Sequence, residues 1–252
     1  MRRAVSMGLA LGLVAGSAWA APQTVTSPAT QVSLLELYTS EGCDDCPPAE
    51  QWLSGLQQDD RLWKRVVPVT FHVDYWDYLG WRDPFDSHSY TLRQQQIAAA
   101  AGGKVIYTPQ FVLDGKDTQA YFNHQPLSLD GGWTVGVLSL TADGRKATVR
   151  FVPAKPRSDR LEAHVVLLAF GVDVPVGAGE NKGKTLTHDF LVVAEVHGAL
   201  NQDKSGYTGT MILPANAPAA RSATRYALAG WVSAAGVPAP IQAAGGGIAA
   251  PH

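Results

Sequence analysis

The chain has 252 residues, of which 46% are hydrophobic and 17% are charged. This composition excludes a disordered chain, a collagen-like repeat and a coiled coil, and the length suits one large domain or two smaller ones. The formal net charge of −2 is too close to neutral for electrostatic capture of nucleic acid or of an anionic membrane. We therefore expect a folded protein without a nucleic-acid partner.

Residues 1–20 are typical of a secretory signal peptide. Arg2 and Arg3 precede an apolar run over residues 7–14, and Ala18 and Ala20 supply the small residues of a cleavage site. The apolar run is shorter than the roughly 20 residues that a membrane-spanning helix needs, and no later segment is apolar over that length. We expect a periplasmic or secreted mature chain without a membrane span.

The sequence contains two cysteines, Cys43 and Cys46, in a Cys-x-x-Cys pair. A bridge between them closes too small a loop to constrain the unfolded chain much, which makes a structural staple a poor explanation. Structural zinc would need about four ligands, and no second cysteine pair or His-x-x-x-His completes such a site. Redox chemistry remains, provided that a helix N-terminus stabilises a thiolate. We predict no cofactor and no metal site.

Strand and helix patterns alternate around the cysteine pair. Pro47 and Pro48 fit the first turn of a helix, where a missing backbone N–H costs little, and Trp52, Leu53 and Leu56 continue an apolar helical face. In chain order we expect a strand over 32–38, a helix that begins at the cysteines, a strand over 66–73, a helix over 87–101 and a strand headed by Pro109 that ends at the turn Asp114-Gly115.

Residues 32–115 resemble the thioredoxin-like superfamily. The Cys-x-x-Cys pair at a helix start and the distant Thr108-Pro109 at a strand start carry this resemblance. It implies that Pro109 is a cis-proline beside the cysteines and that Thr108 presents its backbone to a bound peptide. Thioredoxins also carry a buried acid that relays a proton to the second cysteine, and Glu36 is one residue from that position. The other interpretation of Glu36 is an edge or loop-facing carboxylate, because buried acids are rare.

Three stretches resemble more narrowly a family of secreted bacterial thioredoxin-like proteins of uncharacterised function. They are residues 35–43, 46–49 and 71–81. This narrower resemblance implies a fold but no established reaction, so the chemistry has to be argued from the residues.

Position along the predicted helix assigns different roles to the two cysteines. Cys43 is nearest the turn and should be the more exposed sulfur and the attacking thiolate, while Cys46 should resolve a mixed disulfide. The helix N-terminus should lower the pKa of Cys43, but the carboxylates of Asp44 and Asp45 oppose a further negative charge. We therefore expect a weaker oxidant than a pair with neutral intervening residues.

The segment over residues 72–81 allows a metal interpretation and a packing interpretation. His72 and Asp74 share one face of a strand, and copper carriers with thioredoxin folds use two cysteines and a histidine. Those carriers have three residues between the cysteines, so the spacing in this chain departs from theirs. The alternative is that His72 is a strand-end histidine held by hydrogen bonds. Trp76 and its aromatic neighbours should form a packed wall or the rim of a peptide groove.

The second half of the chain has a different pattern. Short β-rich runs separated by turn residues indicate a β-sandwich. Residues 178–185 satisfy a relaxed phosphate-loop pattern but lack its first glycine and precede a β pattern, so we interpret them as a hairpin loop. The β-rich runs cover residues 135–140, 148–152, 164–170, 191–196 and 226–232.

The sequence thus predicts an α/β thioredoxin-like domain over 31–124, followed by an all-β sandwich domain over 125–246. The predicted function is thiol–disulfide exchange with protein or peptide thiols outside the cytoplasm, with Cys43, Cys46 and Glu36 as catalytic residues. Thr108, Pro109 and Trp76 are the expected substrate-binding residues. The alternative is a non-catalytic binding module, less favourably one that binds copper, in which the Cys43–Cys46 disulfide is merely local.

Overall fold

The computed structural model describes residues 21–129, 132–215, 220 and 222–250. The predicted signal peptide, residues 1–20, lies outside the described residues. Within the described residues strands predominate, and the α-helices are α1 (Cys46–Ser54) and α2 (His88–Ala100). Neither of these helices has the length and apolar character needed to cross a membrane.

The first half of the chain contains both α-helices and two short 3-10 helices. Pro47 and Pro48 occupy the first turn of α1, and the hydroxyl of Ser87 caps α2 by accepting a hydrogen bond from the N–H of Ser89. The remaining elements in this half are β1 (Gln23–Thr26), β2 (Ser33–Thr39), η1 (Gly55–Gln58), β3 (Val66–His72), η2 (Asp77–Leu79), β4 (Gln110–Leu113) and β5 (Lys116–Asp117).

The second half is built of strands joined by turns. Its first two strands form a hairpin whose residues alternate between the core and solvent, as expected for a sheet with one wet face. These strands are β6 (Gly136–Asp143), β7 (Lys146–Pro153), β8 (Leu161–Phe170), β9 (Val172–Pro175), β10 (Thr185–His188), β11 (Leu191–Ala199), β12 (Asn201–Asp203), β13 (Gly206–Ile212), β14 (Arg225–Ala234) and β15 (Pro240–Ile248).

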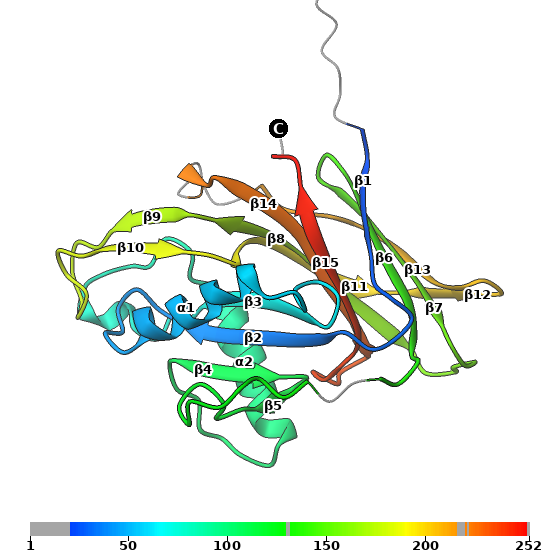
Figure 1. Ribbon diagram of the computed structural model, residues 1–252, viewed down its shortest axis with the longest axis horizontal. Helices are drawn as coiled ribbons and strands as arrows, with labels where there is room; N and C mark the ends of the chain where they lie inside the picture. The colour runs from blue at the N-terminus through cyan, green and yellow to red at the C-terminus, as the bar shows by residue number, and fades with distance from the viewer. Residues whose placement is uncertain (1–20, 130–131, 216–219, 221, 251–252) are drawn as a thin grey trace, which may run out of the picture.

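One eight-stranded sheet contains strands from both halves of the chain. Its order is β15-β14-β8-β11-β3-β2-β4-β5, and the two halves meet where β3 runs parallel to β11, with Thr70 opposite Leu191. At this junction the N–H of Thr70 donates to the carbonyl of Phe190. A five-stranded sheet, β1-β6-β7-β13-β12, and the β9–β10 hairpin complete the architecture (Figure 1).

The predicted fold class is therefore wrong. The chain is mostly β, with multiple sheets and two short α-helices among the described residues, and is not an α/β thioredoxin-like domain followed by a separate sandwich. The patterns located both α-helices and the strands β2, β3, β4, β6, β7, β8, β11 and β14 to within a few residues, but predicted no strand at β1, β12, β13 or β15. They carry no information on which strands pair, because alternation fixes the faces of a strand but not its neighbour.

Strand β8 lies between two hydrophobic cores. Its residues Val166, Leu168 and Phe170 belong to the core that also contains residues of β2, β3 and α1. Its alternate residues, including Val165 and Leu167, belong to the core shared with β6 and β7 of the five-stranded sheet. This alternation lets one strand bury both of its faces, and it couples the helical side of the molecule to the sheet-on-sheet side.

Candidate functional site

Cys43 and Cys46 form a disulfide at the N-terminus of α1, with their Cα atoms 5.5 Å apart. Cys46 is the first residue of the helix, and Asp45 is its N-cap residue. Both cysteines are buried, with 1% of Cys43 and none of Cys46 exposed. The sequence predicted that Cys43 would be the more exposed cysteine, but the two do not differ in exposure. They differ instead in the groups that surround their sulfur atoms.

Thr108, Pro109 and Trp76 lie beside the cysteine pair. The Thr108–Pro109 peptide bond is cis, as the resemblance implied. The indole N–H of Trp76 donates to the hydroxyl of Thr108 at 2.7 Å, and this hydroxyl lowers the pKa of the Cys43 thiol of the reduced pair. The structure thus brings together five residues that the sequence predicted for the site, Cys43, Cys46, Thr108, Pro109 and Trp76.

The two thiols of the reduced pair have opposite pKa shifts. Hydrogen bonds, first from Cys46 and then from Thr108 and backbone N–H groups, hold the pKa of Cys43 below its ordinary value despite partial desolvation. Burial raises the pKa of Cys46 well above its ordinary value, and the neighbouring Cys43 raises it further. Cys43 is consequently the better thiolate, and Cys46 keeps its proton longer.

A cavity of about 700 Å³ opens next to the pair. It is bounded on one side by the start of α1 and on the other by the cis-proline and the segment that follows β5. Its aromatic and polar walls suit an extended peptide better than a compact apolar ligand. The lining residues are Asp45, Pro48, Tyr107, Thr108, Pro109, Gln119, Tyr121 and Phe122.

The loop of the β9–β10 hairpin covers the other side of the cysteine turn. The buried side chain of Asn181 donates to the carbonyls of Glu41 at 3.0 Å and Cys43 at 2.7 Å. The carboxylate of Glu180 accepts a hydrogen bond from the N–H of Asp44 at 3.1 Å. The segment with the phosphate-loop pattern is thus a hairpin loop, and its role in the fold is to hold the turn that carries Cys43.

Glu36 is buried on β2, but its carboxylate interacts with other partners than the cysteines. It accepts hydrogen bonds from the guanidinium of Arg93 at 2.6 and 3.0 Å and from the hydroxyl of Tyr38 at 2.8 Å. Thr39, three residues later on the same strand, points to the opposite face, where α1 lies. The interpretation of Glu36 as an edge carboxylate is wrong, and the structure does not place its carboxylate at the Cys43–Cys46 pair.

Glu50 on α1 is a buried acid connected to the pair through Thr39, and the sequence did not single it out. Its Oε1 accepts a hydrogen bond from the hydroxyl of Thr39 at 2.6 Å, and Thr39 acts to lower the pKa of the Cys46 thiol against the larger effect of burial. Its Oε2 lies 2.6 Å from Nδ1 of His188, which is 138 positions away in the sequence. Glu50 follows Cys46 by one helical turn, and that spacing was the available signal.

His188 is fully buried between two carboxylates. Its Nδ1 faces Glu50, and its Nε2 lies 3.1 Å from Oε1 of Glu41. Burial lowers the pKa of His188, but the charges and hydrogen bonds of Glu50 and Glu41 outweigh this effect and raise the pKa to about 10. His188 is therefore a cation at neutral pH that neutralises part of the buried negative charge behind the cysteine turn.

His72 pairs with Asp83 and not with Asp74. Its Nδ1 lies 2.6 Å from Oδ2 of Asp83, which also accepts a hydrogen bond from the N–H of Glu41. Asp74 instead accepts a hydrogen bond from Thr91 and pairs with His88. The shared strand face of His72 and Asp74 does not bring their side chains to a common site.

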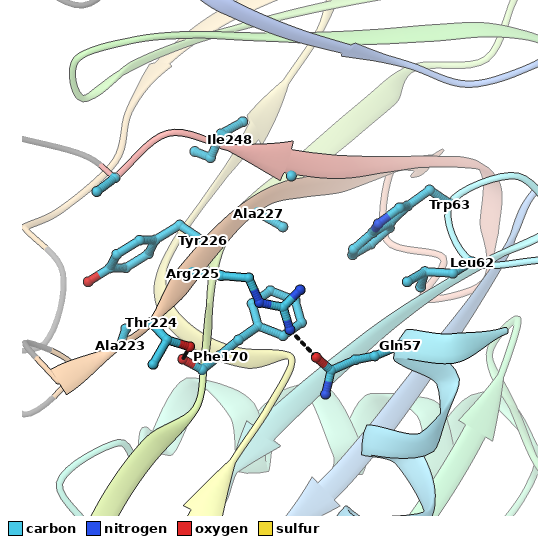
Figure 2. Close-up of a pocket in the computed structure, with 12 residues that line it drawn as sticks. Gln57, Leu62, Trp63, Phe170, Ala223, Thr224, Arg225, Tyr226, Ala227 and Ile248 are labelled. Atoms are coloured by element: carbon cyan, nitrogen blue, oxygen red, sulfur yellow. Dashed lines mark hydrogen bonds between the residues drawn. The ribbon is translucent and has the colours of Figure 1, made fainter. Parts of the chain in front are cut away.

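A separate cavity of about 510 Å³ lies away from these residues (Figure 2). Arg225 stacks over the ring of Phe170, with its guanidinium carbon 5.0 Å from the ring centroid, and hydrogen-bonds to Gln57. Leu62 and Trp63 form part of its apolar wall. The predicted catalytic and substrate-binding residues do not line this cavity.

The described residues define a β-rich protein with a buried disulfide at a helix N-terminus and a buried ionic cluster behind it. The chain matches the family described as "Protein of unknown function (DUF1223)" over residues 34–232, and it belongs to that family. The match runs from β2 to β14, so the family unit contains strands from both halves of the shared sheet. A search of the curated proteins found no match.

Two solved structures are similar to this chain. Protein AGR_C_4864 from Agrobacterium tumefaciens has 26% sequence identity and a TM-score of 0.53, with 85% of this chain and 94% of that chain covered. HBP35 of Porphyromonas gingivalis has 14% identity and a TM-score of 0.55, with 87% of this chain and 76% of that chain covered. The second likeness, at this low identity, concerns the fold alone.

Because the pKa of His188 is raised in the folded state, we predict that the protein loses stability as the pH becomes alkaline. A group whose pKa is higher in the folded state contributes fully below its unfolded value and loses that contribution as pH rises through the folded value. We therefore expect the free energy of unfolding to fall between about pH 6.5 and pH 10. Urea unfolding in EDTA across this range measures the effect, and His188→Gln should flatten the curve and cost about 3–5 kcal/mol.

The exposed His88 provides the matched control for this measurement. Its Nδ1 also faces a carboxylate, that of Asp74, but 68% of its side chain is exposed. His88→Gln should leave the pH dependence of unfolding as it is in the wild type. A His188→Gln protein with the wild-type pH dependence would contradict the assignment of His188 as the titrating group.

The buried pair between Arg93 and Glu36 gives a second prediction. Arg93→Met should destabilise the protein by about 3–5 kcal/mol, because it leaves the carboxylate of Glu36 buried without its partner. Combining it with Glu36→Leu should restore most of the loss. Arg157→Met, which removes a partly exposed pair with Asp159, should cost less than about 1 kcal/mol in the same urea titration. Equal costs for the two arginine variants would refute the prediction.

Proposed function

We propose that this protein exchanges disulfides with protein or peptide thiols outside the cytoplasm through Cys43 and Cys46. The observation that carries the proposal is the unequal surroundings of the two sulfurs. Thr108, which lowers the pKa of Cys43, lines the cavity, whereas burial raises the pKa of Cys46. Exchange needs this inequality, because one sulfur has to meet the substrate and the other has to resolve the mixed disulfide.

The exchange step starts from the disulfide form. A substrate thiolate attacks Sγ of Cys43, the Cys43–Cys46 bond breaks, and Cys46 leaves and takes up a proton. A second substrate thiolate then attacks the substrate sulfur of the mixed disulfide and releases Cys43 as a thiolate. The substrate loses two electrons and gains a disulfide, and the pair gains both electrons. Running the same steps backwards reduces a substrate disulfide.

The charges around the pair bear on the direction of electron flow. Asp44 and Asp45 are exposed beside Cys43, and the Glu180 carboxylate lies at the N–H of Asp44. The net effect of the Cys43 surroundings is nevertheless a lowered pKa of its thiol, because hydrogen bonds stabilise the thiolate. A stabilised thiolate favours the reduced form of the pair, which raises the reduction potential and favours oxidation of substrate thiols.

A binding module with a local disulfide is the second candidate. The burial of both cysteines favours it, since a substrate thiol reaches Sγ of Cys43 only after a local opening. The cavity beside Thr108 and Pro109 would then hold a peptide without reacting with it. The two candidates differ in whether the disulfide exchanges under a physiological redox poise.

The unequal roles of the cysteines predict different behaviour of their serine variants. Cys46→Ser should accumulate a mixed disulfide with glutathione at Cys43, because the resolving thiol is missing. Cys43→Ser should form at least about tenfold less adduct in the same time, since Cys46 is enclosed and its pKa is raised. Mass spectrometry of each variant after incubation with glutathione disulfide measures the adduct.

Equilibration of the wild type in glutathione or dithiothreitol buffers, followed by thiol trapping, separates the two candidate functions. A reduction potential between about −120 and −270 mV supports exchange. A disulfide that stays oxidised below about −300 mV, together with equal adduct yields in the two serine variants, would refute exchange and leave the binding module.

Export is the remaining part of the proposal, and its support is the pattern of residues 1–20. We expect the mature chain to begin at Ala21, with the protein recovered from the periplasm or medium. Replacing Leu11 in the apolar run by Lys should leave the precursor uncut, because a charge there interrupts the hydrophobic segment. N-terminal sequencing of the fractionated protein tests this, and an intact Met1 in a cytoplasmic wild type would contradict it.

A further inference from the structure

Three buried side chains behind the cysteine turn converge on one point. The donor atoms of Glu50, His72 and His188 all lie within 4.8 Å of one another. Each comes from a different element: Glu50 from α1, His72 from the end of β3 and His188 from the end of β10. Less than a tenth of each residue is exposed, so the group belongs to the interior and not to the solvated surface.

His72 presents a nitrogen without a partner to this point. Its Nε2 is buried and has no hydrogen-bond partner among the described residues, while its Nδ1 is held by Asp83 at 2.6 Å. The ring packs edge-on to that of His188, with their centroids 4.9 Å apart. A buried polar atom left unpaired carries a free-energy cost, so it calls for a ligand that offsets the cost.

Each histidine is also oriented by a carboxylate on its far nitrogen. Nδ1 of His72 faces Asp83, and Nε2 of His188 faces Glu41 at 3.1 Å. In metal sites the second ring nitrogen of a ligating histidine typically donates to a carboxylate, which fixes the tautomer and strengthens the ligand. Nδ1 of His188 faces Glu50, and one ring nitrogen of His72 lies within 4.8 Å of the ligand atoms of Glu50 and His188. Because Nδ1 of His72 is held by Asp83, we assign its Nε2 to this group.

We propose that Nε2 of His72, Nδ1 of His188 and the carboxylate of Glu50 bind one divalent transition-metal ion. Two imidazoles and one carboxylate suit Zn²⁺ and other first-row ions, whereas Mg²⁺ and Ca²⁺ prefer oxygen ligands. The ion brings positive charge among the three carboxylates of Glu41, Glu50 and Asp83, which offsets their mutual repulsion. This site is separate from the Cys43–Cys46 disulfide and does not depend on the proposed exchange activity.

A route for the ion leads to Glu50. A cavity of about 410 Å³ lies between α1 and the strand β10, and Glu50 lines it. Pro47, Pro48 and Gln51 form its α1 side, and Thr185 and Thr187 belong to its β10 side. An ion that enters this cavity meets the Glu50 carboxylate first and reaches the two histidines after it displaces the Glu50–His188 hydrogen bond.

Zinc titration of the oxidised, EDTA-treated full-length protein against a chromophoric chelator tests the proposal. We expect one Zn²⁺ per chain, with the affinity lowered at least about 100-fold by His72→Ala or His188→Ala and about 10- to 100-fold by Asp83→Asn. Binding should release protons and strengthen as pH rises, since the histidines bind the ion in their neutral form. Mg²⁺ should not compete, while Cu²⁺ and Fe²⁺ arms identify which ion the site prefers.

Two controls keep the sites apart. His197→Ala alters the other histidine group, His164, Glu195 and His197, and should leave zinc affinity unchanged. The double variant Cys43→Ser/Cys46→Ser should also bind zinc normally, which separates this site from metal capture by free thiols and from any failure of the exchange proposal. Circular dichroism confirms that each variant is folded.

The proposal is overturned by either of two results. A folded wild type that binds no zinc at micromolar free metal has no such site. The ion binds elsewhere if His197→Ala or the cysteine double variant lowers the zinc affinity while Asp83→Asn does not. If the alanine variants do not fold, the Tm of the wild type with and without zinc replaces the titration. A zinc-dependent rise in Tm that is smaller in Asp83→Asn and unchanged in His197→Ala supports the site. The absence of such a rise refutes it.

Discussion

The turn that carries Cys43 depends on the ionic contact of His188 with Glu41 and Glu50. Glu41 belongs to the cysteine turn, Glu50 to α1 and His188 to the distant hairpin, so one imidazolium ties three segments together. Buried carboxylates without a cation would be strongly unfavourable, whereas opposite charges with short hydrogen bonds offset their desolvation. The position of the disulfide is therefore set from behind by charge as well as by helix geometry.

The shared sheet is what makes this contact available. Because β3 pairs with β11, the strand that follows the hairpin lies next to the strand that leads to His72. The hairpin β9–β10 then extends over α1 and brings Asn181 to the carbonyl of Cys43 (Figure 1). The C-terminal half therefore acts as part of the site, with polar groups that reach the cysteines from outside their own segment.

Local signals in the sequence were enough for the cysteines, the cis-proline neighbour, both α-helices and many of the strands, but not for β1, β12, β13 and β15. Proline pairs, capping residues and apolar periodicity act within a few residues, so the α1 start and the Ser87 cap could be predicted. Glu36 shows the limit of such signals, because a one-residue difference along a strand decides which face a carboxylate occupies. His188 lay beyond reach, since its partners are 138 and 147 positions away.

The pairing of β3 with β11 also determines how the chain can be divided. In a fragment that ends at residue 124, β3 would lose its pairing with β11 at Thr70 and become an edge strand of the sheet. All seven residues of that strand are buried in the whole protein, including Val67, Val69 and Phe71. An exposed apolar edge is a template for intermolecular pairing, so we expect the segment that contains both cysteines to self-associate when it is separated from the strands that follow it.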